Sequence, residues 1–203
     1  MIRTCNFWSR CVAAIVLLLS LFSALSNAQQ AAVARQRNLV ELTDEAAVII
    51  HGRVVRAAVE PHPTLTNLTT VVVTMNVEEN LKGESSKSYT FRQYVWDIRS
   101  RYSATYSKGQ ELLLFLRPPS RYGLTSTAGL QQGRFEIHRD PAGKASAINA
   151  NANIGIFDRV KETARARRAM LPAVTEKWSQ QPGTPIDLND LKSMIRAIAG
   201  GKQ

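Results

Sequence analysis

The three histidines, His51, His62 and His138, are the side chains best suited to proton transfer or metal binding. No two of them have the H-x-x-x-H spacing that brings ligands together on a helix, and the nearest carboxylate–histidine pair is Glu60 with His62. Protein sites for first-row metals usually show clustered ligands in the sequence. The sequence therefore predicts no metal ligand among the histidines and no bound cofactor.

Carboxylates and serines give no stronger sign of catalysis. Glu78, Glu79 and Glu84 could supply the carboxylate pair of a glycoside hydrolase, but they lie around the turn NLKGESS, where we expect them to be solvated. The sequence has no G-x-S-x-G elbow and no glycine-rich phosphate loop. These patterns favour a protein that is not an enzyme, with an undetected hydrolase as the third alternative. A pocket that gathers His51 or His138 with two carboxylates would restore the enzyme interpretation.

The stretch FRQYVWDIRSRYSATYSK, residues 91–108, combines five aromatic and four basic side chains. Strand parity places Phe91, Gln93 and Val95 on one face, with Phe91 and Val95 as core residues, and turns Arg92, Tyr94 and Trp96 outward. Exposed tyrosine, tryptophan and arginine are typical of protein-binding hot spots, and the alternative is that the C-terminal helices cover them. The candidate partner-binding residues are Arg92, Tyr94, Trp96, Arg99, Arg101, Tyr102 and Tyr106.

A second candidate surface is basic. In the first predicted C-terminal helix, Lys161, Arg165 and Arg168 fall on one face at i, i+4 and i+7. Such a face could contact an anionic surface, or it could simply be solvated. Together with the loop residues Arg99 and Arg101, it defines the alternative function, an electrostatic adaptor for anionic envelope polymers or lipids.

The N-terminus predicts export. Arg3 and Arg10 precede an uncharged run, Cys11–Leu25, and the small residues Ser26 and Ala28 follow it. This is the pattern of a secretory signal peptide that is cleaved after residue 28. An uncleaved anchor is the alternative, but the run is shorter than the roughly 20 apolar residues that span a bilayer. We therefore expect a periplasmic or extracellular protein without a transmembrane segment in its mature chain.

Cleavage would also change the composition of the chain. Both cysteines, Cys5 and Cys11, leave with the signal peptide, so the mature protein would have neither a disulfide nor a thiolate ligand. The net charge falls by two from +10, because the removed segment holds two arginines and no acid. A basic chain favours an anionic partner, and export makes nucleic acid the least available one. We expect an unidentified protein partner or an anionic envelope component, and no nucleic acid.

The elements that would position these residues are mostly short strands. Alternating apolar residues and intervening turn signals predict them. The predicted strands are 47–59, 69–83, 88–96, 110–119, 122–129, 133–140 and 143–157. A short helix over 38–47 precedes them. Helical patterns follow over 158–171 and from an N-cap at Asp187 to Gly200, with a linker at 178–185 between them.

These elements predict a mainly β fold: an antiparallel, OB-like closed barrel with a short N-terminal helix and C-terminal α-helices. The expected organisation is a signal peptide at 1–28, a disordered leader at 29–38, a barrel domain at 39–157 and a helical appendage at 158–203. We expect the appendage to pack on the barrel, because a helical unit of under 50 residues buries too little surface to fold alone.

Three segments resemble a known group of proteins: DEAAVIIHGRVV (44–55), VTMNVEENLKG (73–83) and KGQELLLFL (108–116). In this order they resemble a group of uncharacterised exported bacterial proteins and, more weakly, the netrin-like domain of tissue inhibitors of metalloproteinases. The resemblance implies an OB-fold barrel. Gly52 agrees with it, because a glycine inside a strand marks a bulge or a sharp bend, which a small barrel needs.

The inhibitory chemistry of that family does not follow from the resemblance. The inhibitors bind the zinc of their target through a cysteine at the mature N-terminus, whereas the expected mature N-terminus here is Gln29. The sequence therefore predicts an exported, non-catalytic binding protein that contacts a protein partner through the aromatic and basic face of its barrel.

Overall fold

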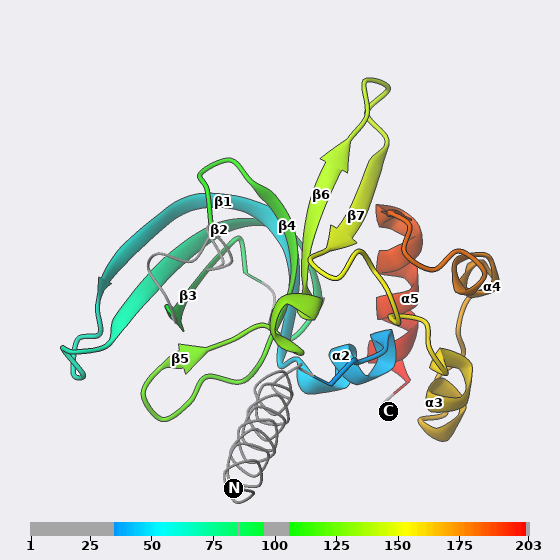
Figure 1. Ribbon diagram of the computed structural model, residues 1–203, viewed down its shortest axis with the longest axis horizontal. Coiled ribbons are helices and arrows are strands. Elements are labelled where there is room, and N and C mark those ends of the chain that lie inside the picture. The colour runs from blue at the N-terminus through cyan, green and yellow to red at the C-terminus, as the bar shows by residue number, and fades with distance from the viewer. Residues whose placement is uncertain (1–34, 85, 96–105, 202–203) are drawn as a thin grey trace, which may run out of the picture. The chain divides into compact units, whose positions relative to one another are not determined.

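A mixed β-sheet of eight strands carries most of the fold in the computed structural model, which describes residues 35–84, 86–95 and 106–201. The strands are β1 (Val48–Pro61), β2 (Thr69–Lys82), β3 (Ser88–Tyr94), β4 (Glu111–Leu116), β5 (Leu124–Thr125), β6 (Arg134–Arg139), β7 (Ala145–Asn149) and β8 (Ile186–Asp187). They lie in the order β5-β3-β2-β1-β4-β6-β7-β8, and the long strands β1 and β2 curve with β3 into a half-barrel (Figure 1). The mainly β class is thus confirmed.

The sheet differs from the predicted closed antiparallel barrel in two ways. First, β3 and β5 run parallel, with Arg92 opposite Leu124. Second, β5 and β8 are the two edges and do not pair with each other among the described residues, so the sheet is open. Pro118 and Pro119 end β4 because proline cannot donate to a strand ladder. Of the predicted strand 122–129, only Leu124–Thr125 form a strand, and Thr127 makes an isolated bridge to Leu116. A strand this short cannot bridge the two edges.

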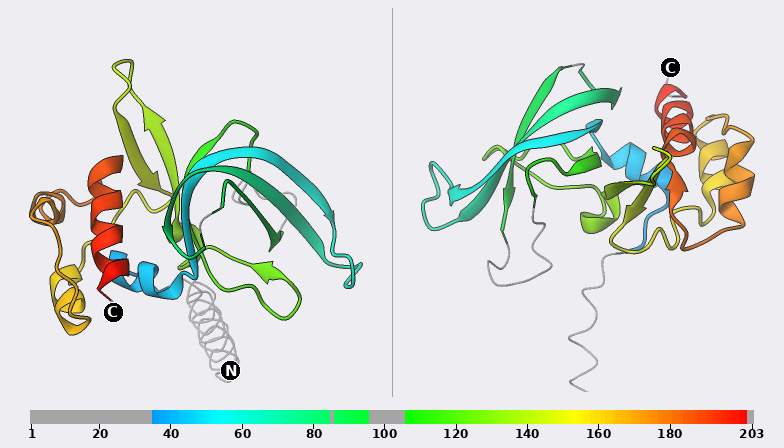
Figure 2. Two further views of the ribbon diagram at one scale, coloured as in Figure 1. Left: turned by 180° about the vertical axis from the view of Figure 1, so that it is seen from behind. Right: turned by 90° about the horizontal axis from the view of Figure 1, so that it is seen from above.

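The described helices are α2 (Leu39–Glu45), the 3-10 helix η2 (Leu130–Gly133), α3 (Val160–Ala166), α4 (Val174–Ser179) and α5 (Leu188–Gly200). α5 has the predicted N-cap, since Asp187 accepts hydrogen bonds from the backbone N–H of Asn189 at 2.9 Å and of Asp190 at 3.2 Å. It lies against α2, β2, β7 and β8 (Figure 2). No helix of the described residues has both the length and the apolar character needed to cross a membrane.

Three details of the C-terminal region differ from the prediction. The first helix ends at Ala166 rather than near residue 171, and the backbone of Arg168 beyond it is left-handed. α4 and β8 were not predicted. The predicted signal peptide lies outside the described residues, as does most of the leader. At the described end of the leader, the backbone N–H of Arg37 donates to Gln132 at 2.8 Å, and Asn38 caps α2.

Two apolar clusters pack on the opposite faces of β4. Leu112 and Leu114 belong to the cluster inside the half-barrel, whereas Leu113 and Phe115 belong to the cluster beneath α2 and α5. All four are fully buried, in agreement with the predicted buried strand. Because side chains alternate along a strand, Glu111 has the parity of Leu113 and faces the helical side.

A bulge between β1 and β2 lies at the candidate functional site. His51 pairs with Glu79, but Gly52 pairs two residues earlier in β2, so Glu78 is an extra residue in that strand. A Cβ added at Gly52 would lie only 2.1 Å from the carbonyl oxygen of Asn76, so only glycine permits this close approach. The predicted irregularity at Gly52 is confirmed.

Candidate functional site

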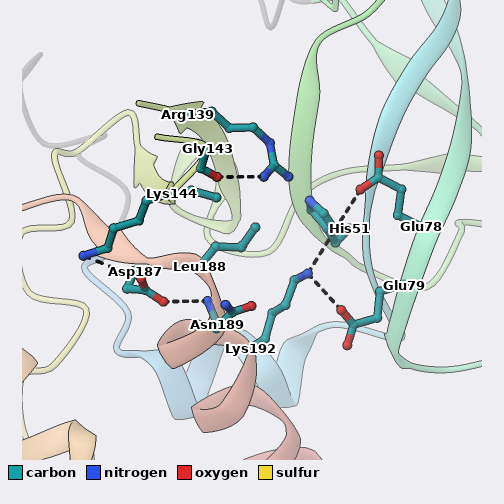
Figure 3. Close-up of a pocket in the computed structure, with 11 residues that line it drawn as sticks. His51, Glu78, Glu79, Arg139, Gly143, Lys144, Asp187, Leu188, Asn189 and Lys192 are labelled. Carbon is teal, nitrogen blue, oxygen red and sulfur yellow. Dashed lines mark hydrogen bonds and ion pairs between the residues drawn. The ribbon is translucent and has the colours of Figure 1, made fainter. Parts of the chain in front are cut away.

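A polar pocket of about 380 Å³ opens where the bulged strands meet the β6–β7 hairpin and the N-terminus of α5 (Figure 3). We call it the charged pocket. Its lining residues are His51, Glu78, Glu79, Arg139, Gly143, Lys144, Ala145, Asp187, Leu188, Asn189 and Lys192. These residues are far apart in the sequence, so only the folded sheet and α5 bring them together.

The bulge explains why two consecutive glutamates line the same pocket. Neighbouring side chains in a regular strand point to opposite faces, but an extra residue breaks that alternation. Glu78 accepts from Arg53 at 3.1 Å, and Glu79 lies 2.8 Å from the ammonium of Lys192. The sequence predicted both glutamates in a solvated turn. Both instead lie within β2 and line the pocket, although Glu78 is exposed as expected and Glu79 is half-buried. Glu84 is exposed as predicted.

Glu111, the first residue of β4, lies behind the pocket and exposes 4% of its side chain. Its carboxylate accepts hydrogen bonds from Arg139 at 2.6 and 3.0 Å, and it also binds Arg53 and His51. Burial alone would raise the pKa of Glu111, but the bonds from Arg139 and His51 and the arginine charges together hold it below its usual value. Glu111 is therefore ionised at neutral pH.

His51 lies between a carboxylate and an ammonium and is 2% exposed. Its Nε2 is 2.9 Å from Glu111, and its Nδ1 is 3.1 Å from the Nζ of Lys192. Since an ionised Glu111 only accepts, Nε2 carries the ring proton and Nδ1 accepts from Lys192. Burial, helped by the charge of Lys192, lowers the pKa of His51 and keeps the ring neutral at neutral pH.

Lys192 is a buried cation within the apolar stripe of α5. It follows Leu188 by one helical turn, lies beside the fully buried Leu191 and exposes 10% of its side chain. Burial lowers the pKa of Lys192, and the carboxylates around it oppose this effect. Arg196, one turn further along α5, also binds Glu79. α5 is therefore attached to β2 and to His51 through charged contacts.

The lining residues and their ion-paired partners carry a small excess of positive charge. His51 is neutral in this count. The cations are Arg53, Arg139, Lys144, Lys192 and Arg196, and the carboxylates are Glu78, Glu79, Glu111 and Asp187. The first turn of α5 adds the positive end of a 13-residue helix.

His51, Glu78 and Glu111 also offer three possible metal-ligand atoms that lie within 4.8 Å of one another. However, two arginines and Lys192 already bind these atoms. A divalent cation would have to displace three positive groups and would be repelled by them. The donor set therefore fits a hydrogen-bonded charge network better than a metal site.

The other two histidines lie outside the charged pocket. His62 is buried, its Nε2 lies 2.8 Å from the carbonyl oxygen of Tyr122, and its Nδ1 accepts from the backbone N–H groups of Thr64 and Leu65. It thus stabilises a turn.

His138 is exposed on β6. His138 shares a neighbouring pocket with Asp140 and Asp187, and His51 lies against Glu78 and Glu111. Both therefore meet the condition that the sequence analysis set for an enzyme, a histidine gathered with two carboxylates.

The predicted parity of the aromatic stretch is confirmed where the structure describes it. Phe91 and Gln93 are buried, while Tyr94 points outward with 38% exposure. Arg92 donates to Thr70 at 2.8 Å and to Glu60 at 2.7 Å, so its guanidinium is already bound within the sheet. The expected partner-binding residues Trp96, Arg99, Arg101 and Tyr102 lie outside the described residues.

Tyr106 was expected in an exposed loop, but it is buried inside the half-barrel. Its ring packs edge-on against Phe91 with centroids 5.6 Å apart, and its hydroxyl donates to Gln93 at 2.8 Å. The physical reason is that Gln93 has the parity of the core and supplies the acceptor that a buried tyrosine needs. Tyr106 therefore contributes no exposed surface.

The predicted basic helix is also divided in the structure. Lys161 lies on α3 and forms an ion pair with Glu176 of α4, and Arg165 is exposed on α3. Arg168 lies beyond the end of α3 in a left-handed conformation, so it does not continue the helical face. The expected stripe of three cations on one helix is therefore wrong.

Sequence analysis did not predict four residues that interact around Glu111 and His51 in the structure: Arg53, Glu111, Arg139 and Lys192. For two of them, the sequence shows a charged residue at a position where an apolar one is expected. Glu111 opens a leucine-rich strand at the parity of its buried leucines, and Lys192 lies within the apolar stripe of the last helix. A charge at an apolar position indicates either an error in the assigned face or a buried partner.

Comparison of this chain with protein families, with characterised proteins and with solved structures finds no match. The arguments below therefore rest on the geometry of the site.

Proposed function

We propose that this chain is an exported binding protein that holds an anionic group of its ligand in the charged pocket. The observation that carries the proposal is the buried network of Glu111, His51 and Lys192 beneath an open polar pocket. Burying charges costs free energy that well-packed apolar residues would not require. Clusters of buried titratable groups in a cleft are typical of functional sites.

The positive groups that face the opening favour an anion. Lys144 exposes 69% of its side chain, and its ammonium is 4.0 Å from Asp187, the longest ion pair in the pocket. It can therefore turn toward a ligand at little cost. Arg139 lies nearby on the same hairpin and donates to the carbonyl oxygen of Gly143 at 3.4 Å (Figure 3). A carboxylate or phosphate that lies between them would also face the N-terminus of α5.

The expected aromatic face is less well supported as the binding site. Of its described residues, Tyr106 is buried and Arg92 is bound to Thr70 and Glu60, which leaves Tyr94 as the exposed aromatic side chain. The charged pocket instead supports the alternative function. Carboxylates and phosphates are the groups by which anionic envelope polymers and lipids are recognised, and the N-terminal pattern of residues 1–28 supports export.

The test is calorimetric titration of the chain with inorganic phosphate and with acetate, at constant ionic strength held with chloride. Binding should also raise the midpoint of thermal unfolding as the ligand concentration rises. Lys144→Gln should weaken binding several-fold because it removes a cation at the rim of the pocket.

Lys108→Gln is the matched control, because it removes the same charge from an exposed turn outside the pocket. It should leave the affinity unchanged. The proposal fails if neither anion binds, or if the two variants weaken binding equally.

A further inference from the structure

Lys192, His51 and Glu111 lie in the order nucleophile, base and orienting group, which is typical of an activated nucleophile. The amine of Lys192 is 3.1 Å from Nδ1 of His51, and Nε2 of the same ring is 2.9 Å from the carboxylate of Glu111. A nucleophile that is hydrogen-bonded to a base, with the base oriented by a third group, is the common arrangement of nucleophilic sites on unrelated folds. Here an amine occupies the position of the nucleophile.

Glu111 and His51 have the protonation states that this role needs, and burial shifts Lys192 toward the neutral amine. Glu111 is ionised and fixes the Nε2 proton, so the lone pair of Nδ1 faces Lys192. Burial lowers the pKa of Lys192 and thereby favours the neutral amine. The charges of Glu78 and Glu111 raise the pKa of Lys192 and favour the ammonium instead, and Glu79 lies 2.8 Å from Nζ.

We propose that Lys192 binds its ligand covalently and reversibly, as a Schiff base with a carbonyl compound that also carries a carboxylate or phosphate. The inference rests on the proposed function, because the anionic group is the one held by Arg139 and Lys144. Figure 3 shows these two side chains reaching the pocket from the hairpin, while Lys192 enters from α5. A pocket of about 380 Å³ has room for a small molecule between them.

The step balances without a further reactant. The ammonium of Lys192 gives one proton to Nδ1 of His51, and the neutral amine attacks the carbonyl carbon to form a carbinolamine. His51 then returns the proton to the hydroxyl group, which leaves as water. The products are a protonated imine on Lys192, one water molecule and a neutral His51. No electron transfer is involved, and water reverses the reaction.

The experiment traps the imine by reduction. The full chain is incubated at neutral pH with glyoxylate or with glycolaldehyde phosphate and sodium cyanoborohydride, and the reduced adducts are located by peptide mass spectrometry. The exposed Lys87 serves as an internal reference in every sample, because it lies outside the pocket. Lys192 should be modified at least about tenfold faster than Lys87, since general-base assistance commonly contributes that much or more. The two probes show whether a carboxylate or a phosphate is preferred.

Two further measurements separate a reactive site from a lysine that is merely accessible. His51→Gln should slow modification of Lys192 at least about fivefold while Lys87 reacts as before, since it removes the proton acceptor. In the unmutated chain, the neutral probe acetaldehyde should show a smaller preference for Lys192 than the two anionic probes. This second measurement does not depend on the folding of a variant.

The inference is overturned if Lys192 reacts no faster than Lys87 with either anionic probe, or if acetaldehyde shows the same preference as the anionic probes. Failure of the proposed function can be distinguished from this result. Calorimetry that shows phosphate binding, together with an unreactive Lys192, would leave the binding pocket in place and remove only the covalent step.

Discussion

The two faces of the sheet bury polar groups in different ways. Inside the half-barrel, Gln93 and Tyr106 form one neutral hydrogen bond of 2.8 Å, and burial raises the pKa of Tyr106 to about 12. On the helical side, Glu111, His51 and Lys192 form a chain of titratable groups. The neutral pair keeps its protonation state over the whole physiological pH range, whereas the protonation state of the charged chain depends on pH.

This difference separates a structural polar contact from a functional one. A buried neutral pair needs one satisfied hydrogen bond and then behaves as part of the core. A buried charged chain loses hydration that its ion pairs only partly replace, so it contributes little net stability although each member depends strongly on the others. The charged chain lies beneath an open pocket and the neutral pair lies beneath none of the described ones, which is why we assign function to the former.

The largest expected effect is the loss of stability caused by Glu111→Gln. The substitution leaves Arg53, Arg139 and His51 without their common anion, and breaking a buried ion pair costs about 3 kcal/mol of unfolding free energy. Urea denaturation followed by circular dichroism measures it. A loss no greater than that caused by Tyr106→Phe on the opposite face would remove the distinction between the two regions.

Gly52→Ala should cost about 2 kcal/mol or more, because its Cβ would lie 2.1 Å from the carbonyl oxygen of Asn76 and overpacking typically costs about 1–3 kcal/mol. It should also weaken phosphate binding, since the bulge places Glu79 against Lys192 and so helps to hold α5 beside the pocket. Gly200→Ala is the control, because a Cβ there meets nothing within 4 Å. Equal stability of the two variants would show that the bulge is not needed.

Tyr106→Phe should cost about 1 kcal/mol, the usual net value of one hydrogen bond, because Gln93 loses its donor. The loss should be the same at pH 5 and pH 8, since the tyrosine is neutral at both. The same denaturation series measures it. A loss that changes with pH would show that the two faces are coupled.

The smallest effect is the pH dependence of stability. The pKa of His51 is lowered in the folded state, so below the unfolded value of 6.5 the unfolded chain binds a proton that the native chain does not, and stability falls as pH decreases. Glu111 affects the stability at a lower pH than His51 does. Its pKa is also lowered, so its contribution is present above 4.5 and is lost as pH falls through the folded pKa.

His51→Gln should remove the loss of stability just below pH 6.5 and leave the more acidic one. Thermal unfolding between pH 4 and pH 8 tests this expectation. A variant that keeps the full pH profile of the unmutated chain would show that another group is responsible.

The sequence predicted features that depend on local chemistry. Alternation placed Phe91 and Tyr94 on opposite faces, and Asp187 with its apolar stripe predicted α5. The glycine in β1 predicted an irregular strand, because few residues allow such close backbone contact. Each of these signals lies within a few neighbouring residues.

The site could not be predicted in the same way. His51 and Lys192 lie 141 positions apart, and no spacing rule links a strand near the start of the chain to a helix near its end. Glu78 and Glu79 were misplaced because a one-residue bulge changes the face of every residue that follows it. The open sheet was missed because closure depends on the pairing of edge strands, to which Leu124 and Thr125 contribute only a short parallel contact.

The most direct test of the central claim replaces the charged chain with apolar residues. A combined variant, His51→Leu, Glu111→Leu and Lys192→Met with Arg53→Met and Arg139→Met, removes the three buried titratable groups together with the two arginines that Glu111 binds. If the network serves binding rather than folding, the midpoint of thermal unfolding should equal or exceed that of the unmutated chain, because apolar substitutes for buried ion pairs are often neutral or stabilising. The rise in that midpoint on addition of phosphate should disappear. A combined variant as unstable as Glu111→Gln, or one that phosphate still stabilises, would contradict the account.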